Sequence, residues 1–104
     1  MAWICLALAG IFEIVWAYAM KQSEGFSRLL PTVATIGFMV ISFGLLSVAM
    51  RTLPLGTAYA IWTGIGAVGS LAVGILILGE PAGFFRLASA GLILAGIVGL
   101  KLTA

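Results

Sequence analysis

Glu13 is the residue most suited to chemistry in this sequence, because it is a lone acid inside an apolar run from Ala2 to Met20. In a helix that rises about 1.5 Å per residue, it lies about 17 Å from Ala2, near the middle of a bilayer core about 30 Å thick. A carboxylate at that depth is costly and is rarely kept without a function. The bland alternative is a permanently protonated acid that makes a structural hydrogen bond. A carboxyl group that exchanges a proton for a cation would instead support proton-coupled antiport.

The residues one helical turn from Glu13 suit a binding site. Ala9 and Gly10 leave room beside the carboxyl group, and Trp16 adds an aromatic wall or an indole N–H donor on the same helix face. The sequence places no base at the same depth to neutralise the acid. Lys101 is the one candidate partner, and it belongs near a helix end. Glu13 is therefore available to a cationic ligand.

Aromatic and hydroxyl side chains in two later apolar runs are further candidates. Tyr59 and Trp62 are three residues apart with Thr63 beside them, and an aromatic pair suits a cation. Tyr59 is also placed where an interfacial aromatic belt would have it. Ser42 lies at mid-depth in another run, where a hydroxyl either joins the site or bonds back to its own helix.

Small residues indicate where helices bend or pack. Gly64 and Gly66 lie halfway along the third apolar run, where they favour a hinge between two access states or close packing alone. Two stripes of small residues repeat every four positions and would let another helix approach closely, within one chain or between subunits. They consist of Gly66, Ser70 and Gly74, and of Gly91, Ala95 and Gly99 as a candidate dimer interface.

The elements that position these residues must lie in lipid. Of the 104 residues, 63% are hydrophobic and 8% are charged, whereas a soluble domain has about a quarter of its residues charged. The net charge of +2 is too small and too scattered to suggest a nucleic-acid surface. The single cysteine allows no internal disulfide. No nucleophile–base pair or metal-ligand cluster is visible, so we expect no enzyme activity, no metal and no cofactor.

Four apolar runs are long enough to cross a bilayer, and we expect them to be helices of one domain spanning residues 1–104. Continuous apolar runs lack the alternation of barrel strands, and lipid tolerates only closed hydrogen bonding. The predicted spans are about 2–20, 31–50, 57–78 and 84–102. The last is short, because 14 uncharged residues separate Arg86 from Lys101. We expect Arg86 to extend its charge to the headgroups.

The basic residues are divided almost equally between the two sides of the membrane. The side with both termini would hold Arg51 and Lys101, and the other side would hold Lys21, Arg28 and Arg86. The excess of cytoplasmic bases that normally fixes orientation is therefore almost absent. Either the protein inserts in both orientations, or a small excess of basic residues on one side is enough to fix a single orientation. Mixed orientation would allow an antiparallel homodimer with the inverted symmetry that larger transporters encode as repeats.

With Glu13, the run from Gly56 to Gly66 and the tail from Gly96 to Lys101, the sequence resembles the small multidrug resistance family over essentially its whole length. The resemblance implies four-helix protomers, dual topology and an antiparallel homodimer. It also implies proton-coupled export of cations across the bacterial inner membrane. Two Glu13 carboxylates, one from each subunit, would bind protons and substrate alternately.

Trp16 and Lys101 make the sequence more similar to the guanidinium exporters of that family than to its quaternary-ammonium exporters, which usually have a small and a neutral residue there. Guanidinium is planar and offers parallel N–H donors that a carboxylate accepts well. The resemblance implies a substrate- and proton-binding set of Glu13, Trp16, Ser42, Tyr59 and Trp62, with Lys101 and Thr63 as accessory residues. The alternatives are a multidrug exporter of hydrophobic cations and a membrane assembly subunit that transports nothing.

Overall fold

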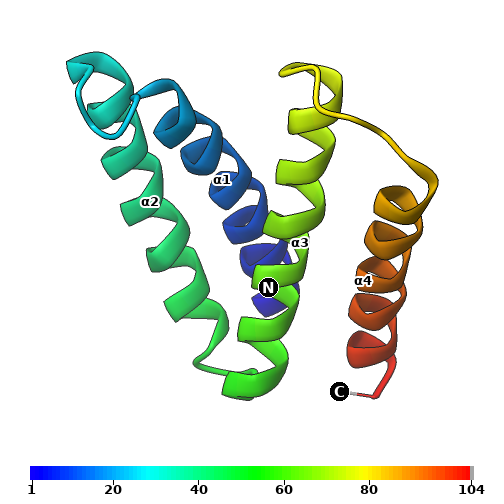
Figure 1. The fold of residues 1–104 in the computed structure, drawn as a ribbon. Helices are drawn as coiled ribbons and strands as arrows, with labels where there is room; N and C mark the ends of the chain where they lie inside the picture. The colour runs from blue at the N-terminus through cyan, green and yellow to red at the C-terminus, as the bar shows by residue number, and fades with distance from the viewer. Residues whose placement is uncertain (104) are drawn as a thin grey trace.

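The computed structural model describes residues 1–103, which form four helices joined by short connections (Figure 1). The helices are α1 (Ala2–Gln22), α2 (Leu29–Ala49), α3 (Leu55–Leu76) and α4 (Phe84–Thr103). Each is long and apolar enough to cross a membrane, and residues 1–103 contain no strand. The prediction of an all-helical membrane protein with four spans is confirmed.

The helix ends lie within two residues of the predicted ones and follow local backbone signals. Arg28 is extended (φ −100°, ψ 124°) and α2 begins directly after it, so Pro31 falls in the first turn, where its missing N–H is harmless. Pro54 is likewise extended (φ −60°, ψ 148°) and precedes α3. Beyond the end of α3, Gly79 has a φ of 73°, a left-handed conformation that favours glycine.

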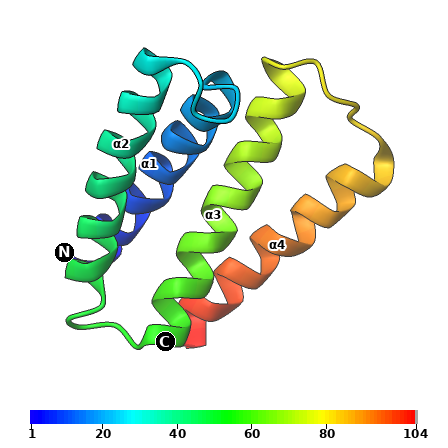
Figure 2. The same cartoon turned by 60° about the vertical axis from the view of Figure 1, so that its left-hand side comes forward.

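The helices are not packed equally around one axis. α1 packs along α2 and against α3, whereas within residues 1–103 the backbone of α4 comes close only to that of α3, and α4 reaches α1 through the Lys101 side chain. Figure 2 shows α4 close to α3 near the C-terminus and diverging from it toward the α3–α4 connection. The first three helices therefore form the body of the protomer, and α4 is attached at one side.

The buried core is small and lies where α1, α2 and α3 meet. Its apolar members are Leu6, Ala9, Leu46, Ala49, Ala58, Ile61 and Trp62. Most large apolar side chains outside this cluster are exposed, and α4 has no buried residue. A soluble protein does not expose its apolar surface in this way, but a helix bundle whose solvent is lipid does.

Close helix crossing in the body depends on glycine. A Cβ built on Gly10 of α1 would lie 2.6 Å from Cγ2 of Ile65 in α3, and a Cβ on Gly69 of α3 would overlap Ile14 of α1. Both positions exclude a larger residue without a shift of the neighbouring helix. The α1–α3 contact that positions Glu13 is thus set by backbone proximity.

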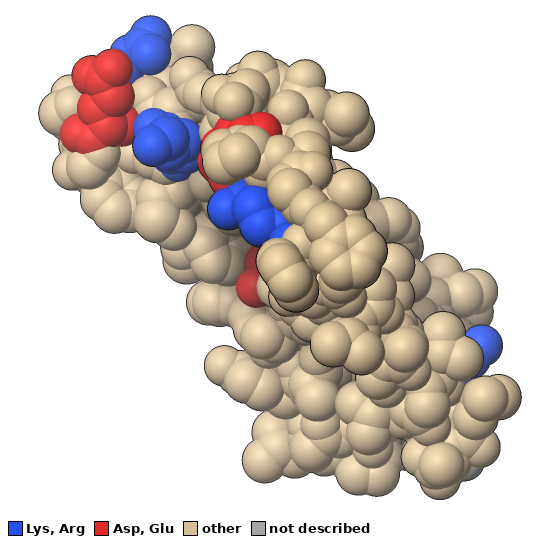
Figure 3. Space-filling model, turned by 45° about the vertical axis from the view of Figure 1, so that its right-hand side comes forward, with Lys and Arg blue, Asp and Glu red and all other residues tan. Residues whose placement is uncertain are grey.

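The two ends of the bundle differ in polarity. The α1–α2 and α3–α4 connections lie at one end, and the N-terminus and the α2–α3 connection lie at the other (Figures 1 and 2). In the face drawn in Figure 3, most of the blue and red surface gathers toward the end with the α1–α2 and α3–α4 connections, and the remainder is nearly all tan. The apolar body between the two ends matches the part of the molecule that lipid would surround.

Candidate functional site

Glu13 lies near the middle of α1, on the side that faces α3. A Cβ built on Gly66 of α3 would overlap the Glu13 carboxyl group, so it is the missing side chain at Gly66 that makes room for the acid. The Oε1 atom of Glu13 is buried and has no hydrogen-bond partner within residues 1–103. A buried polar atom without a partner is unfavourable, and a ligand that donates a hydrogen bond would satisfy it.

Trp16, three residues after Glu13, carries the complementary unpaired group. Its indole Nε1 is buried and finds no acceptor in the described part of the chain. An indole N–H acts only as a hydrogen-bond donor, whereas an ionised carboxylate acts only as an acceptor. One turn of α1 therefore carries both an unpaired donor and an unpaired acceptor.

Ser42 connects the three helices of the body. Its fully buried hydroxyl donates to the backbone carbonyl of Ala9 in α1 at 2.6 Å and accepts the indole N–H of Trp62 in α3 at 3.0 Å. It does not bond back to its own helix, the alternative that the sequence left open. Ser42 therefore holds Trp62 in a fixed orientation and fixes the crossing of α1 and α2.

A row of aromatic rings runs from α1 through α2 to α3. The ring of Phe43 lies edge-on to Trp16, with 6.2 Å between centroids, and edge-on to Trp62 at 5.6 Å. Tyr59 continues the row, 5.5 Å from Trp62, and is 53% exposed. Such rings suit a planar cation, which can lie against their faces. Phe43 is absent from the predicted site residues, and its place beside Ser42 is the one sequence signal that points to it.

Of the two accessory residues, Lys101 lies apart from Glu13, and Thr63 is exposed. The Lys101 ammonium is 5.6 Å from the centroid of the Trp3 ring, and both residues line a cavity of about 210 Å³ between α1, α3 and α4. Trp3 precedes Glu13 by ten residues, about 15 Å along α1. Thr63 is exposed although its neighbour Trp62 is buried. Within one protomer, the structure does not bring Lys101 to Glu13.

The small residues predicted as a hinge and as an interface have different surroundings. Gly64 is buried, and a Cβ there would lie 2.9 Å from Cδ1 of Ile97, so it permits the contact between α3 and α4. By contrast, a Cβ on Gly91 or Gly99 would meet no atom within 4 Å, and Ala95 between them is exposed. Within the described residues, this face of α4 is therefore open to another helix. Bending at Gly64 and Gly66 stays a prediction.

Within residues 1–103, no group of three or more His, Cys, Asp or Glu residues could hold a metal ion. The group in the site that can exchange a ligand is the Glu13 carboxyl group, whose Oε1 atom is unpaired within residues 1–103. A proton can occupy it, or a cation that donates N–H bonds and stacks on aromatic rings.

Comparisons with known proteins agree with this description. The profile of the family described as Small Multidrug Resistance protein matches residues 1–93. The chain is 64% identical over 104 residues to a protein of Salmonella typhimurium named Guanidinium exporter, covering 100% of this chain and 99% of the relative. Proteins with the same name from Citrobacter freundii and Yersinia pseudotuberculosis are 59% and 58% identical over 103 and 102 residues, with at least 98% of each chain covered.

These relatives are bacterial, and the four membrane-spanning helices make the chain a multi-pass protein of the bacterial inner membrane. The family profile covers most of the chain, and the similarity to the three relatives extends over nearly its full length. The chain belongs to the small multidrug resistance family.

Proposed function

We propose that this chain is a proton-coupled antiporter that exports guanidinium or a related small guanidinyl cation. The observation that carries the proposal is the Oε1 atom of Glu13, buried midway along a membrane-spanning helix without a hydrogen-bond partner within residues 1–103. A planar cation with N–H donors would satisfy this atom. The name of the relatives, Guanidinium exporter, supports the same substrate.

In the proposed mechanism, a proton and the cation compete for Glu13. When the carboxyl group is ionised, it accepts N–H bonds from guanidinium while the aromatic row of Trp16, Phe43, Trp62 and Tyr59 offers ring faces to the planar ion. The Trp16 N–H, which cannot bond a cation, would donate to the carboxylate and orient it. Binding of a proton would then release the cation, so transport of one drives transport of the other.

We further propose that the working unit is an antiparallel homodimer of chains inserted in both orientations. The exposed face of α4 at Gly91, Ala95 and Gly99 supports this, because it allows close approach of a second helix and residues 1–103 leave space above both glycines. The near-equal division of basic residues supports mixed orientation. A dimer would contain two Glu13 carboxyl groups.

The test is the current that guanidinium evokes from proteoliposomes on a solid-supported membrane. Wild type is compared with Glu13→Gln and with Glu24→Gln, a matched control that removes an exposed acid from the α1–α2 connection. We expect a guanidinium current in wild type and in Glu24→Gln, and none in Glu13→Gln.

Two other results would replace the proposal. A current with tetra-alkylammonium but none with guanidinium would favour the multidrug exporter, for which the aromatic row offers apolar surface. No current with any cation would favour a membrane assembly subunit.

A further inference from the structure

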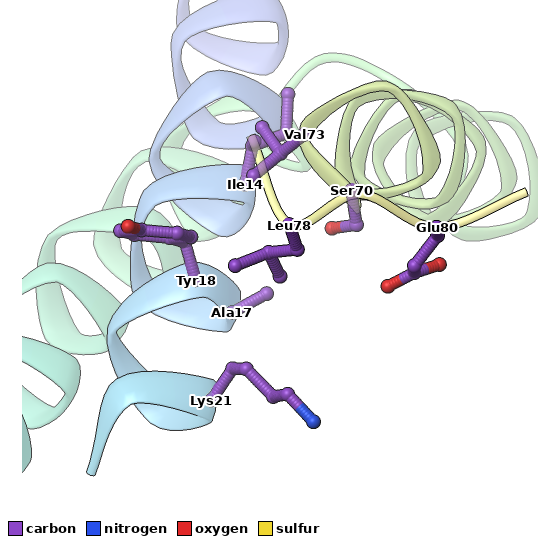
Figure 4. A pocket seen from close by; sticks show the side chains of 8 residues that line it. All are labelled: Ile14, Ala17, Tyr18, Lys21, Ser70, Val73, Leu78 and Glu80. Atoms are coloured by element: carbon purple, nitrogen blue, oxygen red, sulfur yellow. The ribbon is translucent and has the colours of Figure 1, made fainter. Parts of the chain in front are cut away.

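Another cavity, of about 150 Å³, lies between α1 and α3 at the end of the bundle that carries the α1–α2 and α3–α4 connections (Figure 4). Its polar lining residues are Tyr18 and Lys21 of α1, Ser70 of α3, and Glu80 in the connection after α3. None of these residues belongs to the set around Glu13. The cavity combines one acid, one base and two hydroxyl-bearing side chains in otherwise apolar walls.

The turn that ends α3 folds Glu80 back onto that helix. The backbone N–H of Glu80 donates to the carbonyl of Gly74 at 2.9 Å, and Gly79 supplies the left-handed residue that the turn requires. A Cβ on Gly74 would lie 2.6 Å from Oε2 of Glu80. The Glu80 carboxyl group therefore lies directly over Gly74.

The position of Glu80 indicates a role for the stripe of Gly66, Ser70 and Gly74 that the sequence alone did not indicate. The Glu13 carboxyl group lies over Gly66, the Glu80 carboxyl group lies over Gly74, and Ser70 lies one turn from each. Gly66 and Gly74 are about 12 Å apart along the helix. One face of α3 thus joins a carboxyl group inside the membrane to another at the end of the bundle, with a hydroxyl group between them.

Glu80 is occupied by a guanidinium group of the chain itself. Arg86 Nη2 lies 3.1 Å from Glu80 Oε1, the one ion pair within 4 Å among residues 1–103. The side chains are 40% and 44% exposed, and ion pairs of such exposure contribute little to stability. Arg86 also lies in the first turn of α4, where the helix dipole disfavours a cation, and its buried Nε has no partner in the described chain. The pair is therefore suited to exchange rather than to holding the fold.

We propose that Glu80 is an outer cation site at which a free guanidinium ion replaces the Arg86 side chain before it moves along the Gly66–Ser70–Gly74 face to Glu13. The second step rests on the proposed function, whereas binding at Glu80 does not. Lys21 lines the same cavity and repels a cation held there. This repulsion keeps the outer site weak, as a site on a transport path must be if the ion is to leave it.

Binding at the outer site is tested without transport. Guanidinium chloride is titrated into the Glu13→Gln protein in lipid nanodiscs while the NMR signal of the Arg86 Nε–H group is followed, with tetramethylammonium chloride as a cation that lacks N–H donors. We expect a saturable shift with guanidinium, none with tetramethylammonium, and none with either in Glu13→Gln/Glu80→Gln. No shift, or equal shifts with both salts, would overturn the proposal.

The second test uses the direction of two transport effects. Glu80→Gln is expected to raise the KM for guanidinium about threefold to tenfold with kcat unchanged, because it removes the attracting charge. Arg86→Gln is expected to lower KM, because it frees Glu80, and the double variant should behave as Glu80→Gln does. An ion pair that only stabilises the fold would shift both single variants in the same direction, and that result would refute the outer site. If wild-type protein moves no guanidinium, the proposed function fails, and the NMR titration still decides on Glu80.

Discussion

Glu13 is proposed to hold either a proton or guanidinium, which makes cation affinity dependent on pH. The ionised carboxylate binds the cation much more strongly than the protonated carboxyl group does, so lowering the pH must raise the Kd for guanidinium, by up to about tenfold per pH unit. At high pH the Kd should become constant. The tryptophan fluorescence of a Trp3→Phe variant, which retains Trp16 and Trp62, titrated with guanidinium between about pH 5 and about pH 9, measures this. A Kd that does not change with pH would contradict competition at one carboxyl group.

Ser42 is expected to act through Trp62 and through the helix crossing that it fixes. Ser42→Ala leaves the buried Trp62 N–H and the Ala9 carbonyl without their partner. An unpaired buried donor costs about 1–3 kcal/mol, so the unfolding free energy in detergent should fall by about that amount and guanidinium should bind more weakly. Ser47→Ala, on the exposed side of α2, is the control. Equal stabilities of the two variants would show that the Ser42 bonds contribute nothing net.

At the scale of the helices, Gly66 is expected to serve Glu13 by its lack of a side chain. Gly66→Ala places a methyl group where the carboxyl group lies, so guanidinium affinity should fall at least about tenfold. Gly44→Ala, whose Cβ would meet nothing within 4 Å, is the matched control. A hinge at Gly66 would give another result: exchange between the two access states, measured by NMR, would slow while affinity stayed the same.

The helices were predictable because each is a long apolar run, and a buried carboxyl group stands out in such a run. That Glu13 and Trp16 share a helix face was predictable for a further reason, since both lie on one helix and their spacing fixes the face. Their role in transport stays a prediction. The bond from Ser42 to Ala9 was not predictable, because it depends on how closely α1 and α2 cross.

Other contacts could not be predicted from the sequence, because they depend on the conformation of a turn or on the angle between two helices. Arg86 reaches Glu80 since the turn at Gly79 folds the acid back onto α3, and nothing in the spacing of the two residues requires that. Lys101 is the one base that the sequence offers as a partner for Glu13. It lies instead over Trp3, where the approach of α4 to the body places it.

For the whole molecule, mixed orientation predicts that two variants, each forced to insert in one of the two opposite orientations, restore export when they are produced together. Thr52→Lys adds a base to the α2–α3 connection and Ser27→Lys adds one to the α1–α2 connection, so each should favour one orientation. Each variant alone should lose guanidinium export, and their co-expression should restore it. Accessibility of a C-terminal tag from both sides of the membrane in wild type is the companion measurement. A tag found on a single side, or export by either variant alone, would contradict dual topology.

The attachment of α4 has a consequence for gene dosage. Because the backbone of α4 comes close only to that of α3 within residues 1–103, and α4 buries none of its own residues, further packing for this helix must come from lipid or from another polypeptide. If the partner is a second copy, the number of working pairs at low abundance rises with the square of the number of chains in the membrane. Halving expression would then reduce export about fourfold. A faster transport cycle raises export only in proportion to its rate. A cell with few copies would therefore gain more tolerance to guanidinium from an increase in transcription than from an equal increase in the rate of the cycle.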